Sequence, residues 1–255
     1  MKSYRIAISV LGITAAFLLF LSCTKQTGKE VALEKYDLDN YARLQVYNVA
    51  VGNQRNYVYI DGKPVTGAAL LYTNATFTPL FPATPNSFIV TPGIRSFSIR
   101  DTLGTSTQPQ LAFAENLAAN SYYTIFAYDT MSAIKQKTVL TTIVTPSDST
   151  ARVRFGNFVF FKTGVPPNVD IFSKRRNANV FTNIAVTEVT DFIPYESGTA
   201  DSLIVRSTGT TTALDTAVFN FTRKRSYTLV FRGRYAVNEA GTNTFPRTLS
   251  SFNNY

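Results

Sequence analysis

The chain has 255 residues, with 25 Lys and Arg against 16 Asp and Glu for a net charge of +9, one Cys, and neither His nor Trp. The absence of His excludes Ser-His-Asp and Cys-His catalysis, His-ligated zinc and a His pH switch. A single Cys excludes an internal disulfide and a Cys-based metal cluster. The length allows one large domain or two modest ones.

Residues 1–22 have the pattern of a lipoprotein signal peptide. A short basic opening precedes an apolar stretch over residues 6–21, which falls short of the roughly 20 residues that span a bilayer. Leu21-Ser22-Cys23 then resembles a lipobox, in which the Cys receives acyl chains such as palmitate and becomes the new N-terminus. We therefore predict lipid attachment at Cys23 and a place in the cell envelope, in the outer membrane of a Gram-negative bacterium. The alternatives are a plain signal peptide and an uncleaved anchor.

Residues 23–40 are mostly polar and are predicted to be a tether that holds the folded part away from the membrane. With Cys23 acylated, the mature chain would carry no thiol. The fold must then be held by burial of apolar side chains, which a chain of this size can supply.

The next segment, residues 41–147, has the period-2 alternation and the Thr, Val, Ile, Tyr and Phe content of β-strands. Asp61-Gly62 and Thr91-Pro92-Gly93 are turn signals. Residues 112–119 form the best short helical candidate. The strand candidates in chain order are residues 41–49, 58–60, 96–100 and 122–127, the last an apolar run that predicts a central strand.

A short linker over residues 145–150 leads to a second segment, residues 150–255, with the same kinds of pattern. Its strand candidates are residues 151–155, 169–171, 202–206 and the apolar run 227–231. Four short stretches match between the two segments in the same order and at nearly constant offset, beginning with Ala42–Asn48 against Ala151–Asn157. The sequence therefore predicts an all-β protein of two tandem immunoglobulin-like, antiparallel β-sandwich domains, placed end to end.

The lipobox, the Ala-Arg-x-x-x-x-Asn strand opening and the Val-x-Ile strand together resemble a bacterial lipoprotein family known as domain of unknown function 4397. The resemblance covers both repeats and implies tandem immunoglobulin-like domains in a Gram-negative envelope. It implies no catalytic residue. The segments after Asn48 and Asn157 depart from the Ser-Pro-Asp-rich loop common in that family.

No acid pair, phosphate-binding loop, calcium loop or nucleophile elbow is evident, so we predict a protein that is not an enzyme and needs no cofactor. The charge is unevenly divided. Residues 36–149 carry seven bases and seven acids, whereas residues 150–255 carry thirteen bases and seven acids. A candidate surface for an envelope polyanion consists of Lys174, Arg175, Arg176, Arg223, Lys224, Arg225, Arg232 and Arg234. The alternative is a set of solvated turns that keep strand edges from pairing.

Five Asp residues are followed by Ser or Thr and then by an apolar residue or Thr, as in an O-glycosylation signal of some Gram-negative envelope proteins. The alternative is that these pairs only form turns. The five candidate acceptors are Thr102, Thr130, Ser149, Ser202 and Thr216.

The sequence therefore predicts a lipid-anchored envelope protein with a binding or scaffolding role, whose partners are the membrane and a polyanion, a glycan or another protein. Nucleic acid is not expected in that compartment. One alternative is a glycan-binding accessory lipoprotein. The other is a pilin or adhesin-like subunit that assembles by strand donation.

Overall fold

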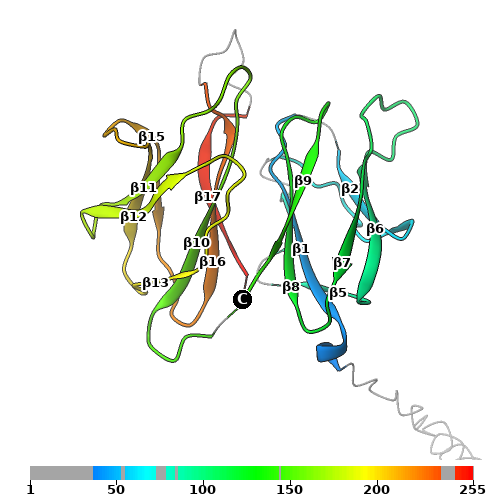
Figure 1. The fold of residues 1–255 in the computed structure, drawn as a ribbon, viewed down its shortest axis with the longest axis horizontal. Coiled ribbons are helices and arrows are strands. Elements are labelled where there is room, and N and C mark those ends of the chain that lie inside the picture. Colours follow the sequence, from blue (N-terminus) through cyan, green and yellow to red (C-terminus); the bar gives the residue numbers. More distant parts are fainter. Residues whose placement is uncertain are drawn as a thin grey trace, which may run out of the picture. The chain divides into compact units, whose positions relative to one another are not determined.

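The computed structural model describes residues 37–52, 55–72, 79–83, 86–143, 145–236 and 245–254. The described part is built of strands β1 to β17 and one short 3-10 helix, Leu38–Asn40 (Figure 1). The all-β prediction is thus confirmed. The described residues contain no helix with the length and apolar character needed to cross a membrane. Cys23 and most of the predicted tether lie outside the described residues.

The first segment forms two sheets. One has the order β4-β1-β8-β9, with β5 also paired to β1, and the other has the order β3-β2-β6-β7. The strands are β1 (Ala42–Asn48), β2 (Tyr57–Ile60), β3 (Lys63–Pro64), β4 (Leu80–Phe81), β5 (Phe88–Val90), β6 (Gly93–Arg100), β7 (Leu111–Leu117), β8 (Tyr122–Tyr128) and β9 (Lys135–Leu140). The helical candidate at residues 112–119 is wrong, because those residues form most of β7 and pair with β6.

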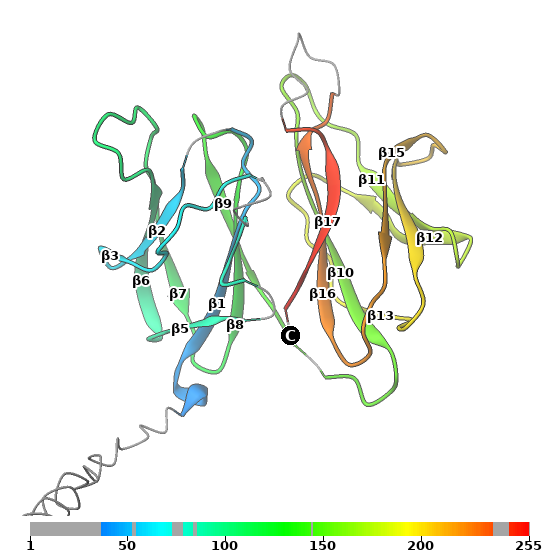
Figure 2. The same ribbon diagram turned by 180° about the vertical axis from the view of Figure 1, so that it is seen from behind.

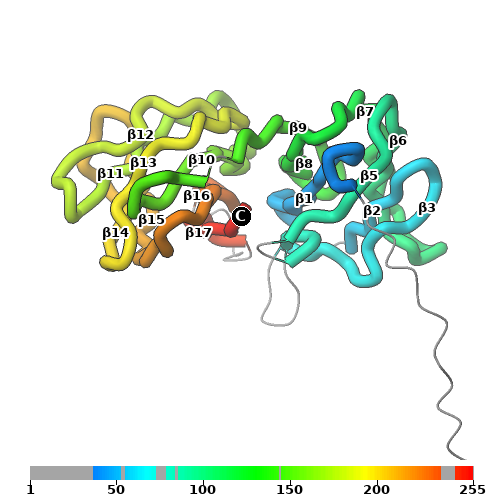
Figure 3. The backbone as a smooth tube through the Cα atoms, turned by 90° about the horizontal axis from the view of Figure 1, so that it is seen from below, coloured from blue at the N-terminus to red at the C-terminus, as the bar shows by residue number. Residues whose placement is uncertain are grey.

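The second segment repeats this arrangement, except that an isolated bridge between Gly156 and Val189 takes the place of β4. Its sheets have the orders β13-β10-β16-β17 and β12-β11-β14-β15, and β17 lies beside β16 at the edge of its sheet (Figure 2). The strands are β10 (Ala151–Phe160), β11 (Val169–Ser173), β12 (Ala178–Ile184), β13 (Ile193–Tyr195), β14 (Asp201–Ser207), β15 (Ala213–Phe219), β16 (Ser226–Arg234) and β17 (Thr248–Asn253). The succession of strands can be followed along the tube in Figure 3.

The pairings between the named strands are antiparallel except at one place in each segment. Strand β1 runs parallel to β8, and β10 runs parallel to β16. The predicted antiparallel sheets are thus found, with one parallel strand pair in each segment as the exception. The physical reason is that the chain passes through the whole opposite sheet between the two strands, and this connection is long enough to join parallel neighbours.

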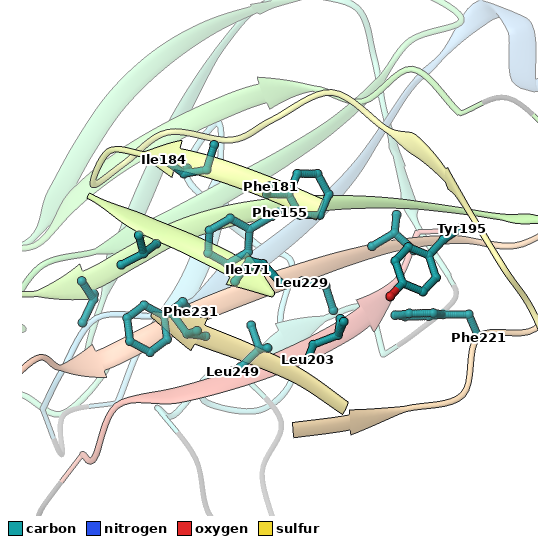
Figure 4. Close-up of a cluster of buried hydrophobic side chains, with 14 of the residues drawn as sticks. Phe155, Ile171, Phe181, Ile184, Tyr195, Leu203, Phe221, Leu229, Phe231 and Leu249 are labelled. Carbon is teal, nitrogen blue, oxygen red and sulfur yellow. The ribbon is translucent and has the colours of Figure 1, made fainter. Parts of the chain in front are cut away.

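Each segment has its own apolar core between its two sheets. The core of the first includes Leu44, Val58 and Ile125, and that of the second includes Phe155, Ile171 and Leu229, all fully buried. Figure 4 shows the second core, with side chains converging from strands of both sheets. The inward residues of the alternating runs supply these cores, as the period-2 pattern requires.

The sequence stretch that matches between the first strands of the two segments ends in both at a buried asparagine. Asn48 donates from its side chain to Leu70 O at 3.0 Å, and its Oδ1 accepts from Ala50 N. Asn157 does the same with Ile184 O at 3.1 Å and Val159 N. The matching Asn in the two repeats therefore satisfies backbone groups that burial would otherwise leave without partners.

A third buried cluster joins the two segments, between the sheet that contains β1 and β8 and the sheet that contains β10 and β16. Phe126 stacks on Phe158 with ring centroids 4.3 Å apart, and Tyr47 stacks on Phe252 at 5.0 Å. The segments thus meet through sheet faces, and the predicted end-to-end placement is wrong. The reason is that the outer faces of β8 and β16 carry the apolar Phe126 and Val230, whose burial favours a cover over these faces. The cluster consists of Tyr47, Val49, Leu80, Phe126, Phe158, Val230 and Phe252.

Candidate functional site

The first basic triplet, Lys174–Arg176, occupies the turn between β11 and β12. Asn177 closes the turn with a φ of 51°, a left-handed conformation that Asn tolerates better than most residues. The turn projects the three basic residues to the surface. The side chain of Lys174 makes no ion pair with the described residues.

Arg175 and Arg176 both contact the carboxylate of Glu196, just after β13. The nitrogen–oxygen distances are 3.1 Å for Arg175 and 2.7 Å for Arg176, and the two side chains are 27% and 30% exposed. Arg176 also lies over the Tyr195 ring, 4.3 Å from its centroid. These two arginines are therefore held in place, and one carboxylate offsets part of their charge.

A buried polar network fixes the base of this turn. Asp201, which is 3% exposed, accepts hydrogen bonds from Ser173 Oγ, from Tyr195 Oη at 2.5 Å and from Arg175 N at 3.0 Å. Burial acts to raise the pKa of the Asp201 carboxyl, but these hydrogen bonds outweigh it and hold the pKa below its ordinary value. Burial and the Asp201 carboxylate raise the pKa of Tyr195 to about 12.

Asp201→Asn is expected to lower the free energy of unfolding by about 2–4 kcal/mol at pH 7, since hydrogen bonds to a buried charge are lost. The pKa of Asp201 is lower in the folded than in the unfolded state, where it is about 3.9. The charged carboxylate therefore stabilises the fold fully above the unfolded-state pKa, and this stabilisation is lost as the pH falls through the folded-state pKa. The difference in unfolding free energy between wild type and variant should therefore become smaller below about pH 4.

Urea unfolding at a series of pH values measures this difference. The matched control is Asp39→Asn, whose side chain is 72% exposed and which should change little at any pH. If the difference in unfolding free energy between wild type and Asp201→Asn stays constant from pH 7 to pH 2, the Asp201 charge does not stabilise the fold as proposed.

The second basic triplet, Arg223–Arg225, lies in the connection from β15 to β16. All three residues are exposed. Lys224 has a φ of 60°, and its backbone N donates to Thr150 O at 2.9 Å, which ties the connection to the start of β10.

The two triplets border the same end of the second segment. Tyr195, under Arg176, packs edge-on against Phe221 with ring centroids 5.3 Å apart, and the two rings lie side by side in Figure 4. Gly198 N also donates to Phe221 O at 2.8 Å. Phe221 stands two residues before Arg223, so one aromatic pair connects both turns. We name Lys174–Arg176 and Arg223–Arg225 together the basic end.

Arg232 and Arg234 lie elsewhere, toward the other end of β16. Arg232 is only 5% exposed, and its Nη1 donates to Tyr72 O at 2.8 Å. Arg234 is half-buried, with its guanidinium 5.6 Å from the Phe160 ring centroid. Arg232 is therefore buried inside the protein and does not belong to the predicted polyanion surface. Arg234 is not part of the basic end.

The five candidate glycosylation acceptors occupy different settings. Thr102 and Ser149 are exposed in loops, and Thr216 is exposed on β15. Ser202 is half-buried in β14, and Thr130 is half-buried beside Val51, with which it forms a bridge. Among the described residues no group of three or more His, Cys, Asp or Glu side chains is placed to hold a metal ion.

Sequence reasoning missed Arg154, which the alternation Arg152-Val-Arg154-Phe places on the outer face of β10. It is 2% exposed. Arg154 matches Gln45 in the repeat, and in the structure Gln45 also contacts the other segment, through Asn253 O and Asn254. The strand pattern alone does not distinguish an outer face in water from one covered by a second sheet.

No family model and no curated protein matches the chain. The structure has distant similarity to carbohydrate-binding modules. One is a family 26 module from Eubacterium rectale Amy13K in complex with maltoheptaose, with 11% identity, a TM-score of 0.26, and coverage of 82% of this chain and 96% of that chain. A streptococcal virulence factor described as binding alpha-glucan has 11% identity, a TM-score of 0.25 and coverage of 82% and 98%. Family 41 modules from streptococcal virulence factors have 10% identity, a TM-score of 0.25 and coverage of 84% and 97%. Scores this low give no basis for transferring a function. The chain is an all-β protein with two segments that share one strand order apart from β4.

Proposed function

We propose that this chain is a non-enzymatic, lipid-anchored protein of the cell envelope that binds a phosphate-rich polyanion through the basic end of its second segment. The observation that supports the binding role is the convergence of two basic turns, distant in sequence, through the contact between Tyr195 and Phe221. Clustered exposed cations attract polyanions by long-range electrostatics, with a strength that falls as salt screens the charges.

The basic end has two kinds of cation. Arg175 and Arg176 are oriented by Glu196, whereas Lys174, Arg223 and Lys224 make no ion pair with the described residues. The fixed guanidiniums suit directional, bidentate contacts with phosphate oxygens. The lysines and Arg223 would supply charge without a fixed geometry.

The membrane anchor rests on the sequence. Acylation of Cys23 by two or more chains would hold the protein stably at a bilayer, since one chain alone binds only marginally. Growth with an alkyne-bearing fatty acid, followed by purification and labelling, measures acylation directly. Wild type should incorporate the probe and Cys23→Ser should not. Equal incorporation in both would overturn the anchor.

The triple variant Lys174→Gln/Arg223→Gln/Lys224→Gln is expected to bind lipopolysaccharide about 100-fold more weakly than wild type, from about 1 kcal/mol per cation near an anionic surface. Titration of the purified protein in detergent at low and high salt measures this, and wild type should weaken with salt. A matched control, Lys63→Gln/Arg100→Gln/Lys135→Gln, removes the same charge from exposed residues of the first segment. Equal weakening by both triple variants would reject a specific basic end.

A further inference from the structure

A second site candidate lies away from the basic end, where β9 borders the segment Val189–Phe192. A cleft of about 370 Å³ opens there, within the range of small-molecule pockets, about 300–1,000 Å³. Its lining combines the apolar Val139 and Leu140 with Arg154, Thr190, Asp191 and Phe192. Leu140 is 59% exposed and adds apolar surface to the cleft.

Arg154 supplies a fixed cation at this cleft. Its Nε donates to Thr228 Oγ1 at 2.9 Å, and its Nη2 donates to Thr124 Oγ1 at 3.2 Å and to Thr141 Oγ1 at 2.9 Å. Its guanidinium also lies over the Phe192 ring, 4.8 Å from the centroid. Three threonine hydroxyls and one ring therefore fix its orientation.

Two of the five N–H donors of Arg154 remain. The two on Nη1 donate to no described residue, and no described carboxylate lies within ion-pair distance of the guanidinium. Burial lowers the pKa of Arg154 to about 9, while the nearby charge of Asp191 acts to raise it. A buried cation with unused donors is stabilised by any acceptor oxygen that reaches it.

Asp191 restricts the class of ligand that can supply the acceptor oxygen for Arg154. Its carboxylate is exposed on the same cleft and opposes a fully anionic ligand. A carboxylate accepts hydrogen bonds only, and a guanidinium donates them only. A ligand rich in hydroxyl groups satisfies both, because each hydroxyl donates and accepts.

We propose that this cleft binds a neutral saccharide, with hydroxyl oxygens accepting from Arg154 Nη1 and a hydroxyl donating to Asp191. The apolar face of the sugar ring would lie against Val139, Leu140 and Phe192. The cleft is separate from the basic end, so a negative result for one proposal does not affect the other.

A second cleft, at the first residue of β9, favours an oligosaccharide over a single sugar. It has a volume of about 200 Å³ and is lined by Tyr128, Phe158, Asp129 and Lys135, among others. Lys137 Nζ donates at 2.5 Å to the backbone O of Thr187, which lines this second cleft. Strand β9 spans about 17 Å at roughly 3.4 Å per residue, so a chain of sugars lying along it reaches both clefts.

The test uses the full chain purified in detergent, on an array of neutral oligosaccharides (cello-, manno- and malto-series) and acidic oligogalacturonates, followed by calorimetric titration of the strongest binder. We expect binding to a neutral series that tightens with chain length. Asp191→Asn should weaken it about tenfold or more, because a hydrogen bond to a charged acceptor is lost. Asp39→Asn is the matched control and should leave it unchanged.

Two further variants keep the result interpretable. Arg154→Gln places the side chain of the matching Gln45 at this position, and it should weaken sugar binding while the protein retains a wild-type circular dichroism spectrum. The basic-end triple variant should bind the sugar as wild type does. Absence of neutral-sugar binding at millimolar concentration, preference for the acidic series, or equal affinity of wild type and Asp191→Asn would each overturn the proposal.

Discussion

Phe126→Ala is expected to lower the free energy of unfolding by about 3–5 kcal/mol, the range for truncating a buried aromatic ring. Phe126 is fully buried on β8. Its ring stacks on Phe158 at 4.3 Å and meets Tyr47 edge-on at 6.2 Å. Because Phe126 contacts residues of both segments, its loss leaves a cavity between sheets that neither segment can fill alone.

Urea unfolding followed by circular dichroism measures this loss. The matched control is Val218→Ala on β15, where the side chain is 65% exposed and the change should stay within about 0.5 kcal/mol. If the segments are coupled through this cluster, Phe126→Ala should lower the unfolding midpoint of both. A variant that unfolds like wild type would show that the cluster does not stabilise the protein.

Gly233→Ala is expected to destabilise the protein by about 2–5 kcal/mol, for two separate reasons. Gly233 has a φ of 95° inside β16, and a Cβ in a left-handed conformation costs about 1–2 kcal/mol. A Cβ there would also lie 2.2 Å from Pro246 O and 2.5 Å from Tyr72 Oη. Relieving such overpacking costs about 1–3 kcal/mol more.

Gly209→Ala separates the two reasons. Gly209 has a φ of 78°, but a Cβ at that position meets no atom within 4 Å. Only the conformational cost should appear there, about 1–2 kcal/mol. Comparing the urea midpoints of both variants tests the close approach at Gly233, and equal losses would contradict it. The close approach matters because Tyr72 Oη donates to Pro246 O at 2.9 Å and Arg232 donates to Tyr72 O.

The sequence predicted much of the fold because strand signals are local. Alternation marked β6 and β10, and apolar runs marked β8 and β16 as central strands, which pair on both sides as expected. Asp61-Gly62 forms the predicted turn between β2 and β3, with φ values of 49° and 76°. These features depend on neighbouring residues, so the amino-acid order suffices to indicate them.

The candidate site was only partly predictable. The triplets Lys174–Arg176 and Arg223–Arg225 were found as charge clusters beside turns, and the structure places them at one end of the second segment. Arg232 belonged to the same sequence pattern but is buried. Nothing local distinguishes it, because its cover comes from Tyr72, 160 residues earlier in the chain.

The sequence alone indicated the strands, the two repeats, the predicted anchor at Cys23 and the uneven charge, since each is a property of composition or of local spacing. The tertiary structure decided which polar side chains on outer strand faces meet water and which meet a second sheet. Gln45 and Arg154 occupy the same place in the two repeats, and both are buried against the other segment. A period of two assigns each residue to a face of its strand, but only the packing of distant elements determines what covers that face.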